Sequence, residues 1–437
     1  MKKGLKLTSL LLVLVMLASF ALTSCGTLGG ISSMIGLFGT LQGVIEEENG
    51  FFEEIPDDEI EEGNKETIDT SGVLDSMDTS YGDGGKITDV TLAAASGLRS
   101  AVSVYATFSS GFSSGSAAGS GVIYQLDAEK GNAFIITNYH VIYNGSSYTQ
   151  NGTISNDIKI FLFGMESTDY AIPATFVGGS PNYDIAILFI QNSDILKQAA
   201  ANGNVKAATI SNSDSIVAGQ TAIAIGNPES SGIAVTSGVV SVDSEYIQMT
   251  SINGTDTVEF RVIRIDTAVN SGNSGGGLFN DEGELMGIVN AKITKSDVEN
   301  IGYAIPSNVA RAIADNIIDY CFGKDTQNVM RAMLGVTVTV GELSSRYDEE
   351  KGIITQVEKV VVVETTEGGL AYGVLETDDV IKSITIGEKT VQVTRRHHLI
   401  DTMLDARIGD KVTFKIIRDG AEKTVEFTIT EDCLTAY

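Results

Sequence analysis

The sequence is poor in the residues that cross-link small proteins or bind metals. Among 437 residues it has three histidines and three cysteines, Cys25, Cys321 and Cys433. Three thiols are too few for a disulfide scaffold, and a single disulfide between Cys321 and Cys433 is the alternative. No CxxC, HExxH or other paired metal-ligand spacing occurs, so we expect neither a metal nor another cofactor.

Basic residues are also scarce. The chain has 29 Lys and Arg against 57 Asp and Glu, which gives a formal net charge of −28. Because phosphate binding needs a basic surface, this balance disfavours nucleic acid as a partner. Either the charge only keeps the protein soluble and away from anionic lipid, which we favour, or it serves a specific binding role.

The N-terminal region reads as a leader followed by a tether. A short basic start and an apolar run over 7–22 are typical of a secretory signal, here residues 1–24. The ending Leu-Thr-Ser-Cys resembles the bacterial lipobox, which implies a lipid anchor on Cys25; the alternative is a soluble secreted protein with an incidental cysteine. Ten of the seventeen residues over 46–62 are acidic, so we expect 25–86 to be a disordered tether. Whether its apolar, glycine-broken first part lies on the bilayer or packs on the folded module stays open.

One glycine-rich stretch carries the strongest chemical signal. Residues 266–279 read DTAVNSGNSGGGLF and place Ser274 between glycines. Such a turn frees backbone amides to point at one spot, where they can stabilise a developing oxyanion. Ser274 is therefore a candidate nucleophile, and the alternative is a plain glycine-rich turn between two strands.

A nucleophilic serine needs a base and a carboxylate that orients the base. His397 and His398 lie in a polar stretch far downstream, which leaves His140, at the end of AFIITNYHVI, as the histidine upstream of Ser274. Asp184 opens the apolar strand DIAILFI, where a buried charge would be costly without a partner. We therefore predict a triad of His140, Asp184 and Ser274.

The order of these residues and the words around them resemble the HtrA/Deg family of chymotrypsin-like serine proteases. The matching words are GSGVI (119–123), TNYHV (137–141), YDIAIL (183–188), GNP (226–228) and VTSGVVS (235–241), followed after the serine by GIVNAKI (287–293) and IGYAIPSN (301–308). The resemblance implies an oxyanion hole from the amides of Gly272, Asn273 and Ser274. The sequence departs from the family pattern at Ser271, where the family usually has proline.

The same resemblance implies a specificity pocket formed by Ala268, Asn290, Ala291 and Lys292. No carboxylate lies among these residues, so we expect a preference for small or medium aliphatic side chains before the cut bond. An apolar pocket discriminates by only about 1 to 3 kcal/mol per methylene, so this would be a preference and not a rule.

The fold class is expected to be mainly β. Short β-branched runs divided by Gly, Ser and Asn, with no helices between them, favour antiparallel barrels or sandwiches, and the resemblance adds two six-stranded barrels in a protease domain over 87–322. A short helix is expected near 87–95. PSNVARAIADNIIDYC (306–321) places Val309, Ile313, Ile317 and Tyr320 on one helical face, which predicts a helix that closes the module.

A second domain is expected over 328–437. It resembles an HtrA-type PDZ domain, with Met333, Leu334, Gly335 and Val336 at the loop that binds a peptide carboxylate. Thr377 stands where the family usually has glycine, which leaves the turn there uncertain, and a generic small β domain is the alternative.

Together these features predict a membrane-anchored, extracytoplasmic serine endopeptidase that cleaves unfolded or mislocalised proteins and binds C-terminal peptides at its PDZ domain. The alternatives are a regulatory sensor protease and a non-catalytic, peptide-binding chaperone. The family also implies a homotrimer formed through aromatic residues, here Tyr105, Phe108 and Phe112, unless these are ordinary strand residues of the first barrel.

Overall fold

The computed structural model describes residues 88–436, except 111–112, 146–152 and 294–300. The chain divides into the units Met1–Gly84 and Gly85–Tyr437, and the described residues all belong to the second. The expected leader, the lipid anchor on Cys25 and the acidic tether lie outside the described residues. Within the described residues, no helix has both the length and the apolar character needed to cross a bilayer.

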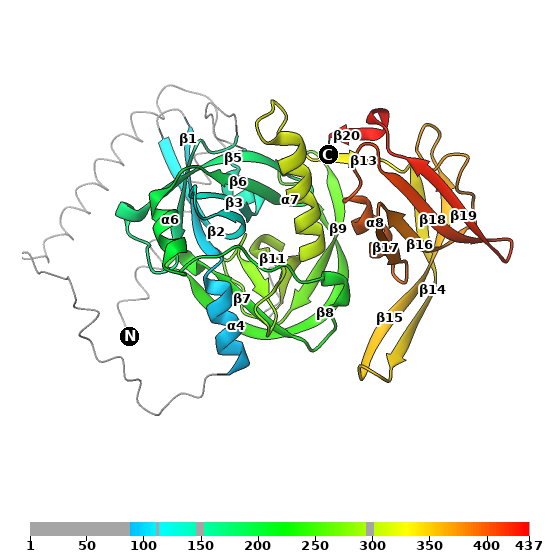
Figure 1. Ribbon diagram of the computed structural model, residues 1–437, viewed down its shortest axis with the longest axis horizontal. Coiled ribbons are helices and arrows are strands. Elements are labelled where there is room, and N and C mark those ends of the chain that lie inside the picture. The colour runs from blue at the N-terminus through cyan, green and yellow to red at the C-terminus, as the bar shows by residue number, and fades with distance from the viewer. Residues whose placement is uncertain (1–87, 111–112, 146–152, 294–300, 437) are drawn as a thin grey trace, which may run out of the picture. The chain divides into compact units, whose positions relative to one another are not determined.

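Residues 101–190 form a closed antiparallel barrel with the strand order β1-β2-β3-β6-β5-β4 (Figure 1). Its strands are β1 (Ala101–Ser110), β2 (Ser113–Asp127), β3 (Asn132–Thr137), β4 (Asp157–Leu162), β5 (Ile172–Ser180) and β6 (Ile185–Ile190). In β4, Ile158, Ile160 and Leu162 are buried while Asp157 and Lys159 are exposed, as the two-residue period of a strand requires.

Residues 221–306 form another closed barrel, with the order β10-β11-β12-β9-β8-β7. Its strands are β7 (Thr221–Gly226), β8 (Ala234–Thr250), β9 (Thr257–Ile265), β10 (Gly277–Phe279), β11 (Leu285–Val289) and β12 (Gly302–Pro306). The expected pair of six-stranded barrels is confirmed, and both barrels are filled by Ile, Val, Leu and Ala.

Short helices join and close the barrels. They are α4 (Asp89–Leu98), the one-turn α5 (Tyr139–Ile142), α6 (Asp194–Ala201) and α7 (Ser307–Cys321). On α7 the side chains of Val309, Ile313 and Ile317 are buried, while Tyr320 is half-buried at the edge of the expected face. Cys321 and Cys433 are both free thiols, so no bridge joins them.

Two of the expected trimer residues instead serve the first barrel. Phe108 is 4% exposed inside it, and the Tyr105 ring packs edge-on against Phe161 with centroids 5.3 Å apart. The Tyr105 hydroxyl accepts a hydrogen bond from Asn227 Nδ2 at 3.1 Å. These two residues therefore follow the alternative interpretation as packed strand residues, and Phe112 lies outside the described residues.

A C-terminal sheet follows, with the order β14-β15-β16-β18-β19 and β17 paired to β16. Its strands are β14 (Val336–Asp348), β15 (Ile353–Thr365), β16 (Val380–Ile386), β17 (Lys389–Gln392), β18 (Lys411–Arg418) and β19 (Ala421–Thr428), and β13 (Met330–Ala332) pairs with β20 (Leu434–Ala436). Helix α8 (Arg396–Met403) lies between β17 and β18 in the sequence. At the uncertain turn, Asp378 and not Thr377 adopts positive φ, at 73°, which aspartate tolerates.

Candidate active site

The buried carboxylate of Asp184 organises the site. The residue stands just before β6 with φ of 53°, and its side chain is 1% exposed. Oδ1 accepts the His140 amide at 2.9 Å, and Oδ2 accepts from Asn290 Nδ2 at 2.8 Å and lies 2.6 Å from His140 Nδ1. Three donors thus compensate the cost of burying this charge.

His140 lies on the one-turn helix α5, directly after β3. The backbone carbonyl of Asp184 accepts from Asn138 Nδ2 at 2.8 Å and from the Tyr139 amide at 3.2 Å, which holds this turn in place. Because Nδ1 faces the carboxylate, the ring proton belongs there and Nε2 keeps a free lone pair. The imidazole is therefore oriented as a base.

Ser274 lies in the tight turn before β10. Gly272 and Gly275 have φ of 94° and 85°, and a Cβ at either position would lie 2.2 Å from a backbone oxygen. The turn therefore needs glycine at both places.

Ser120 of β2 fastens this turn to the first barrel. Its amide donates to the Ser274 carbonyl at 2.8 Å and its hydroxyl donates to the Gly272 carbonyl at 2.7 Å. The same hydroxyl oxygen accepts the Asn227 amide at 2.7 Å. In the sequence this serine stands only as part of the word GSGVI, and its role becomes visible only in the fold.

Two of the three expected oxyanion donors are available. The amides of Gly272 and Ser274 donate to no acceptor among the described contacts. The Asn273 amide instead donates to the Asn270 carbonyl at 3.0 Å, so in this conformation it cannot serve an oxyanion. Ser271, which replaces the usual proline, accepts the Glu229 amide with its carbonyl at 2.8 Å.

His140, Ser274 and Gly272 border one cavity of about 380 Å³. Its remaining lining residues are Ser116, Ala117, Ala118, Val141, Glu229, Ser230 and Ser271. The Ser274 hydroxyl oxygen accepts the Ala291 amide at 3.1 Å, and among the described contacts it makes no hydrogen bond to His140. Proton transfer to Nε2 therefore requires the hydroxyl to turn toward the imidazole, since such contacts often tighten only when substrate binds.

The expected specificity-pocket residues do not border this cavity. None of Ala268, Asn290, Ala291 and Lys292 lines the 380 Å³ cavity. Ala268 and Lys292 are exposed and Ala291 is half-buried, while Asn290 is 0% exposed and bonds Asp184. Asn290 is thus a positioning residue and not a pocket wall. Glu229, which no sequence motif singles out, lines the cavity with φ of 53°.

A second cavity, of about 440 Å³, lies in the C-terminal part. The loop residues Met333, Leu334, Gly335 and Val336 line one side of it. Leu399, Ile400 and Met403 of α8 also line it. The amides of Leu334 and Gly335 donate to no acceptor among the described contacts, so free N–H donors border this groove.

Comparison with known proteins agrees with this geometry. A family model described as a trypsin-like peptidase domain matches residues 119–288. "Serine protease Do-like HtrA" of Lactococcus lactis subsp. cremoris (strain MG1363) is 32% identical over 326 residues, covering 72% of this chain and 71% of the relative.

A second relative and a solved structure are also similar to this chain. The protein of the same name from Bacillus subtilis (strain 168) is 32% identical over 324 residues, covering 72% of this chain but only 64% of the relative. The solved structure "HtrA-type protease AlgW with tripeptide" is 26% identical, covers 79% of this chain and 97% of that chain, and has a TM-score of 0.49.

We predict that Asn290→Ala lowers kcat for peptide hydrolysis by about ten- to a hundredfold with little change in KM, because a hydrogen bond to a charged group contributes about 1.5–3 kcal/mol. Steady-state kinetics measures both constants. Asn308→Ala is the control, since Asn308 bonds Asn212 and not Asp184. An unchanged kcat in Asn290→Ala would show that this bond does not position the carboxylate.

Proposed function

The chain belongs to the HtrA family of trypsin-like serine proteases, and on that premise we propose that it is a serine endopeptidase that works outside the cytoplasm and removes unfolded or mislocalised proteins. The observation that carries this proposal is the buried Asp184 carboxylate, which orients His140 beside the cavity that Ser274 also borders.

In this proposal each residue has one task. The Ser274 hydroxyl attacks the peptide carbonyl, and His140 Nε2 takes its proton and returns it to the leaving amine. Asp184 holds the imidazole and stabilises the imidazolium that forms. The amides of Gly272 and Ser274 bind the oxyanion, and each such donor contributes about 2.7–4 kcal/mol to the transition state.

Two alternatives keep the same fold. A non-catalytic chaperone would not need an intact triad, whereas here all three side chains are present and the Asp184–His140 pair is formed. A sensor protease would use the same chemistry on one dedicated substrate. A serine-reactive fluorophosphonate probe separates the chaperone from both proteases, because only an activated serine reacts with it.

We predict that Ser274→Ala abolishes cleavage of an unfolded protein such as casein and labelling by the fluorophosphonate, while the chain stays folded. The methyl group nearly fills the space of the hydroxymethyl group but offers no nucleophile. Gel assays and mass spectrometry measure both effects. The control is Ser167→Ala, at an exposed serine whose side chain makes no capping bond. Cleavage that persists in Ser274→Ala would overturn the assignment.

The proposed substrates are chains whose aliphatic residues have become exposed. The family resemblance assigns the pocket for the side chain before the cut bond to Ala268, Ala291 and Lys292, and none of these is a carboxylate, so on that assignment cuts should follow Val, Ala, Ile or Leu. Such residues are buried in native proteins and exposed on unfolding. The anchor is proposed at Cys25, on the evidence of the lipobox-like ending of the leader.

We propose that the C-terminal part is a PDZ domain whose 440 Å³ groove takes a C-terminal peptide. Among the strands that the structure describes, β14 lies at the edge of its sheet and pairs only with β15. It can therefore receive an extended peptide as a further strand. The free amides of Leu334 and Gly335 then stand where the peptide's carboxylate would end.

We predict that fluorescently labelled peptides with an apolar C-terminal residue bind the chain, and that C-terminal amidation weakens binding at least about tenfold, since charge-assisted hydrogen bonds contribute about 1.5–3 kcal/mol. Gly335→Val should have the same effect, because a Cβ at this residue, whose φ is 62°, would lie 2.8 Å from the Gly369 Cα. Fluorescence anisotropy measures binding. Equal affinity for amidated and free peptides would refute the carboxylate site.

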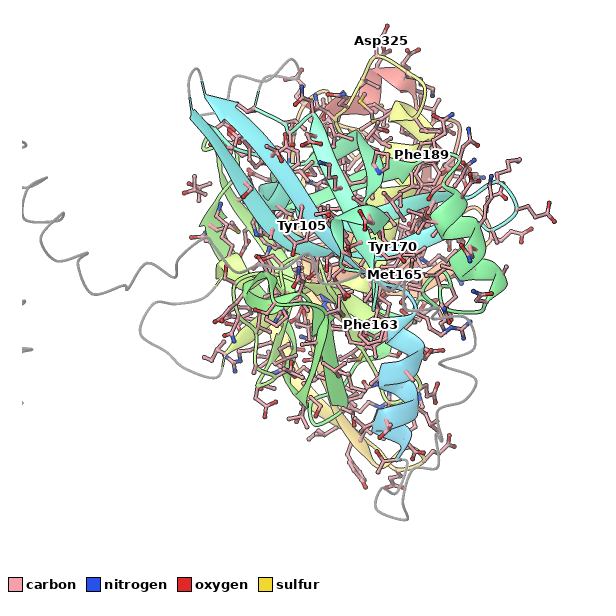
Figure 2. All side chains as sticks on the ribbon, turned by 90° about the vertical axis from the view of Figure 1, so that its left-hand side faces the viewer. Tyr105, Phe163, Met165, Tyr170, Phe189 and Asp325 are labelled. Carbon is pink, nitrogen blue, oxygen red and sulfur yellow. The ribbon has the colours of Figure 1, made fainter. Side chains whose placement is uncertain are left out.

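We also propose a homotrimer, as the family suggests, but through other residues than Tyr105 and Phe108. Phe163 and Tyr170, on the connection between β4 and β5, are 50% and 46% exposed, and Figure 2 shows them with Met165 on one face. Large exposed apolar side chains gathered on one face are typical of an interaction surface.

Analytical ultracentrifugation of the full chain in mild detergent should therefore show a trimer at micromolar concentration, and the double variant Phe163→Ser, Tyr170→Ser should sediment as a monomer. Leu343→Ser, at a 63% exposed residue of strand β14, should stay trimeric. A monomeric wild-type chain would refute the proposed trimer. A trimeric double variant would refute the assignment of Phe163 and Tyr170 to the trimer interface.

A further inference from the structure

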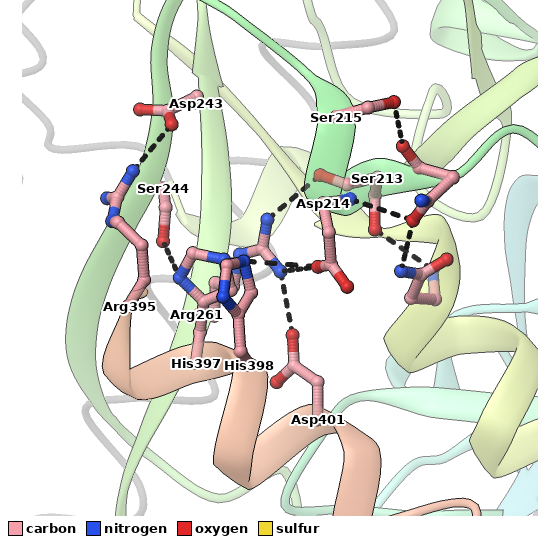
Figure 3. A network of polar contacts seen from close by, with 12 residues as sticks. Ser213, Asp214, Ser215, Asp243, Ser244, Arg261, Arg395, His397, His398 and Asp401 are labelled. Atoms are coloured by element: carbon pink, nitrogen blue, oxygen red, sulfur yellow. Dashed lines mark hydrogen bonds and ion pairs between the residues drawn. The ribbon is translucent and has the colours of Figure 1, made fainter. Parts of the chain in front are cut away.

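Three side chains with metal-binding atoms converge where α8 meets the second barrel (Figure 3). Asp214 belongs to the short 3-10 helix Ser213–Ser215, and His397 and His398 are consecutive residues of α8. One ligand atom from each lies within 4.8 Å of the other two. Two imidazoles and a carboxylate are ligands that suit zinc.

The Nδ1 atom of each histidine already has a polar neighbour. His397 Nδ1 lies 3.2 Å from Ser244 Oγ, and its Nε2 lies 3.9 Å from Asp214 Oδ1. His398 Nδ1 accepts a hydrogen bond from the Thr394 amide at 3.3 Å and lies 3.4 Å from Thr394 Oγ1, and the ring also has the Gln392 backbone as a hydrogen-bond partner. A hydroxyl oxygen that accepts Nδ1–H leaves Nε2 free to bind a metal, which is how outer-shell partners orient metal-bound histidines. Zinc binding at His398 Nε2 requires the ring proton to lie on Nδ1. Nδ1 then donates to the Thr394 hydroxyl and no longer accepts from the Thr394 amide.

The charge of the cluster also favours a cation. Arg261 Nη1 donates to Asp214 Oδ1 at 2.9 Å and to Asp401 Oδ2 at 2.7 Å, so one guanidinium serves two carboxylates. Arg395 and Arg396 also lie near His397. Arg395 pairs with Asp243 and Glu358, and Arg396 pairs with Glu259, so the carboxylates around the cluster outnumber the arginines. Asp214 Oδ2 accepts no hydrogen bond among the described contacts, so this oxygen remains for an ion.

An ion can reach the cluster from solvent. A cavity of about 720 Å³ is bordered by Asp214, Thr394 and His398. Water from this cavity can supply a further ligand, as in zinc sites with three protein ligands. Tetrahedral zinc, with bonds of about 2.0–2.2 Å, holds its ligands roughly 3.4 Å apart, so the side chains would close in by roughly 1 Å.

We propose that Asp214, His397 and His398 form a zinc site, with water as the fourth ligand, that joins α8 to the second barrel. Because α8 also lines the 440 Å³ groove through Leu399, Ile400 and Met403, the ion would hold the groove's helix against the barrel. The site is independent of the triad and shares no residue with it.

The test uses the full chain, stripped with a chelator and titrated with Zn²⁺ alone by calorimetry. We expect one ion per chain and a rise in melting temperature, since an ion that binds only the folded state stabilises it. His398→Gln, checked by near-UV circular dichroism, should weaken binding at least about tenfold and lose the thermal shift. Asp405→Asn is the matched control, because Asp405 borders the same cavity but pairs with Arg311 and Lys389.

The following outcomes would refute the proposed zinc site. Absence of Zn²⁺ binding to the wild-type chain does so, and so does equal binding by His398→Gln. Binding that survives in His398→Gln but is lost in His140→Ala would place the ion at the triad. The visible absorption spectrum of the wild-type chain loaded with Co²⁺ tests the geometry without a variant. A weak spectrum of the octahedral type would contradict the tetrahedral site.

Discussion

The buried carboxylate of Asp184 is the group on which the rest of the site depends. Its oxygens accept from the His140 backbone, the His140 ring and the Asn290 side chain. The first two donors belong to the first barrel and the third follows the last residue of β11 in the second. An unpaired charge at this depth would cost several kcal/mol, so the folded state favours the arrangement in which both barrels supply their donors. The orientation of the base and the docking of the barrels are therefore one and the same constraint.

Much of this architecture was predictable from short sequence words. A lone acid at the start of an apolar strand, a histidine at the end of another and a serine between glycines predict a triad of His140, Asp184 and Ser274, and the fold brings the Asp184 carboxylate to the His140 ring. The barrels and α7 followed from the periodicity of apolar residues and from family resemblance. Glu229, Ser120 and the true role of Asn290 did not follow, because their contacts join residues far apart in the chain and carry no local pattern.

Contacts between residues far apart in the chain also limit what a missing sequence motif can exclude. The absence of paired metal-ligand spacing predicted no metal, since sequence motifs report ligands that lie close together along the chain. His397 and His398 meet Asp214 only because α8 folds back onto the second barrel. Likewise, the expected roles of Asn273 and Phe108 failed on contacts that only the folded chain shows: an amide already bonded to Asn270 and a ring enclosed in the barrel.

Cys321 shows how packing also sets the chemical durability of the protein. Its thiol is 2% exposed at the end of α7 and donates to the Asn328 carbonyl at 3.4 Å. Burial raises its pKa to about 11, so very little thiolate exists near neutral pH. Because the thiolate is the form that oxidants and other disulfides attack, the residue is kinetically protected in oxidising surroundings. Under the proposed role outside the cytoplasm, this burial lets the chain keep an unpaired cysteine in its core.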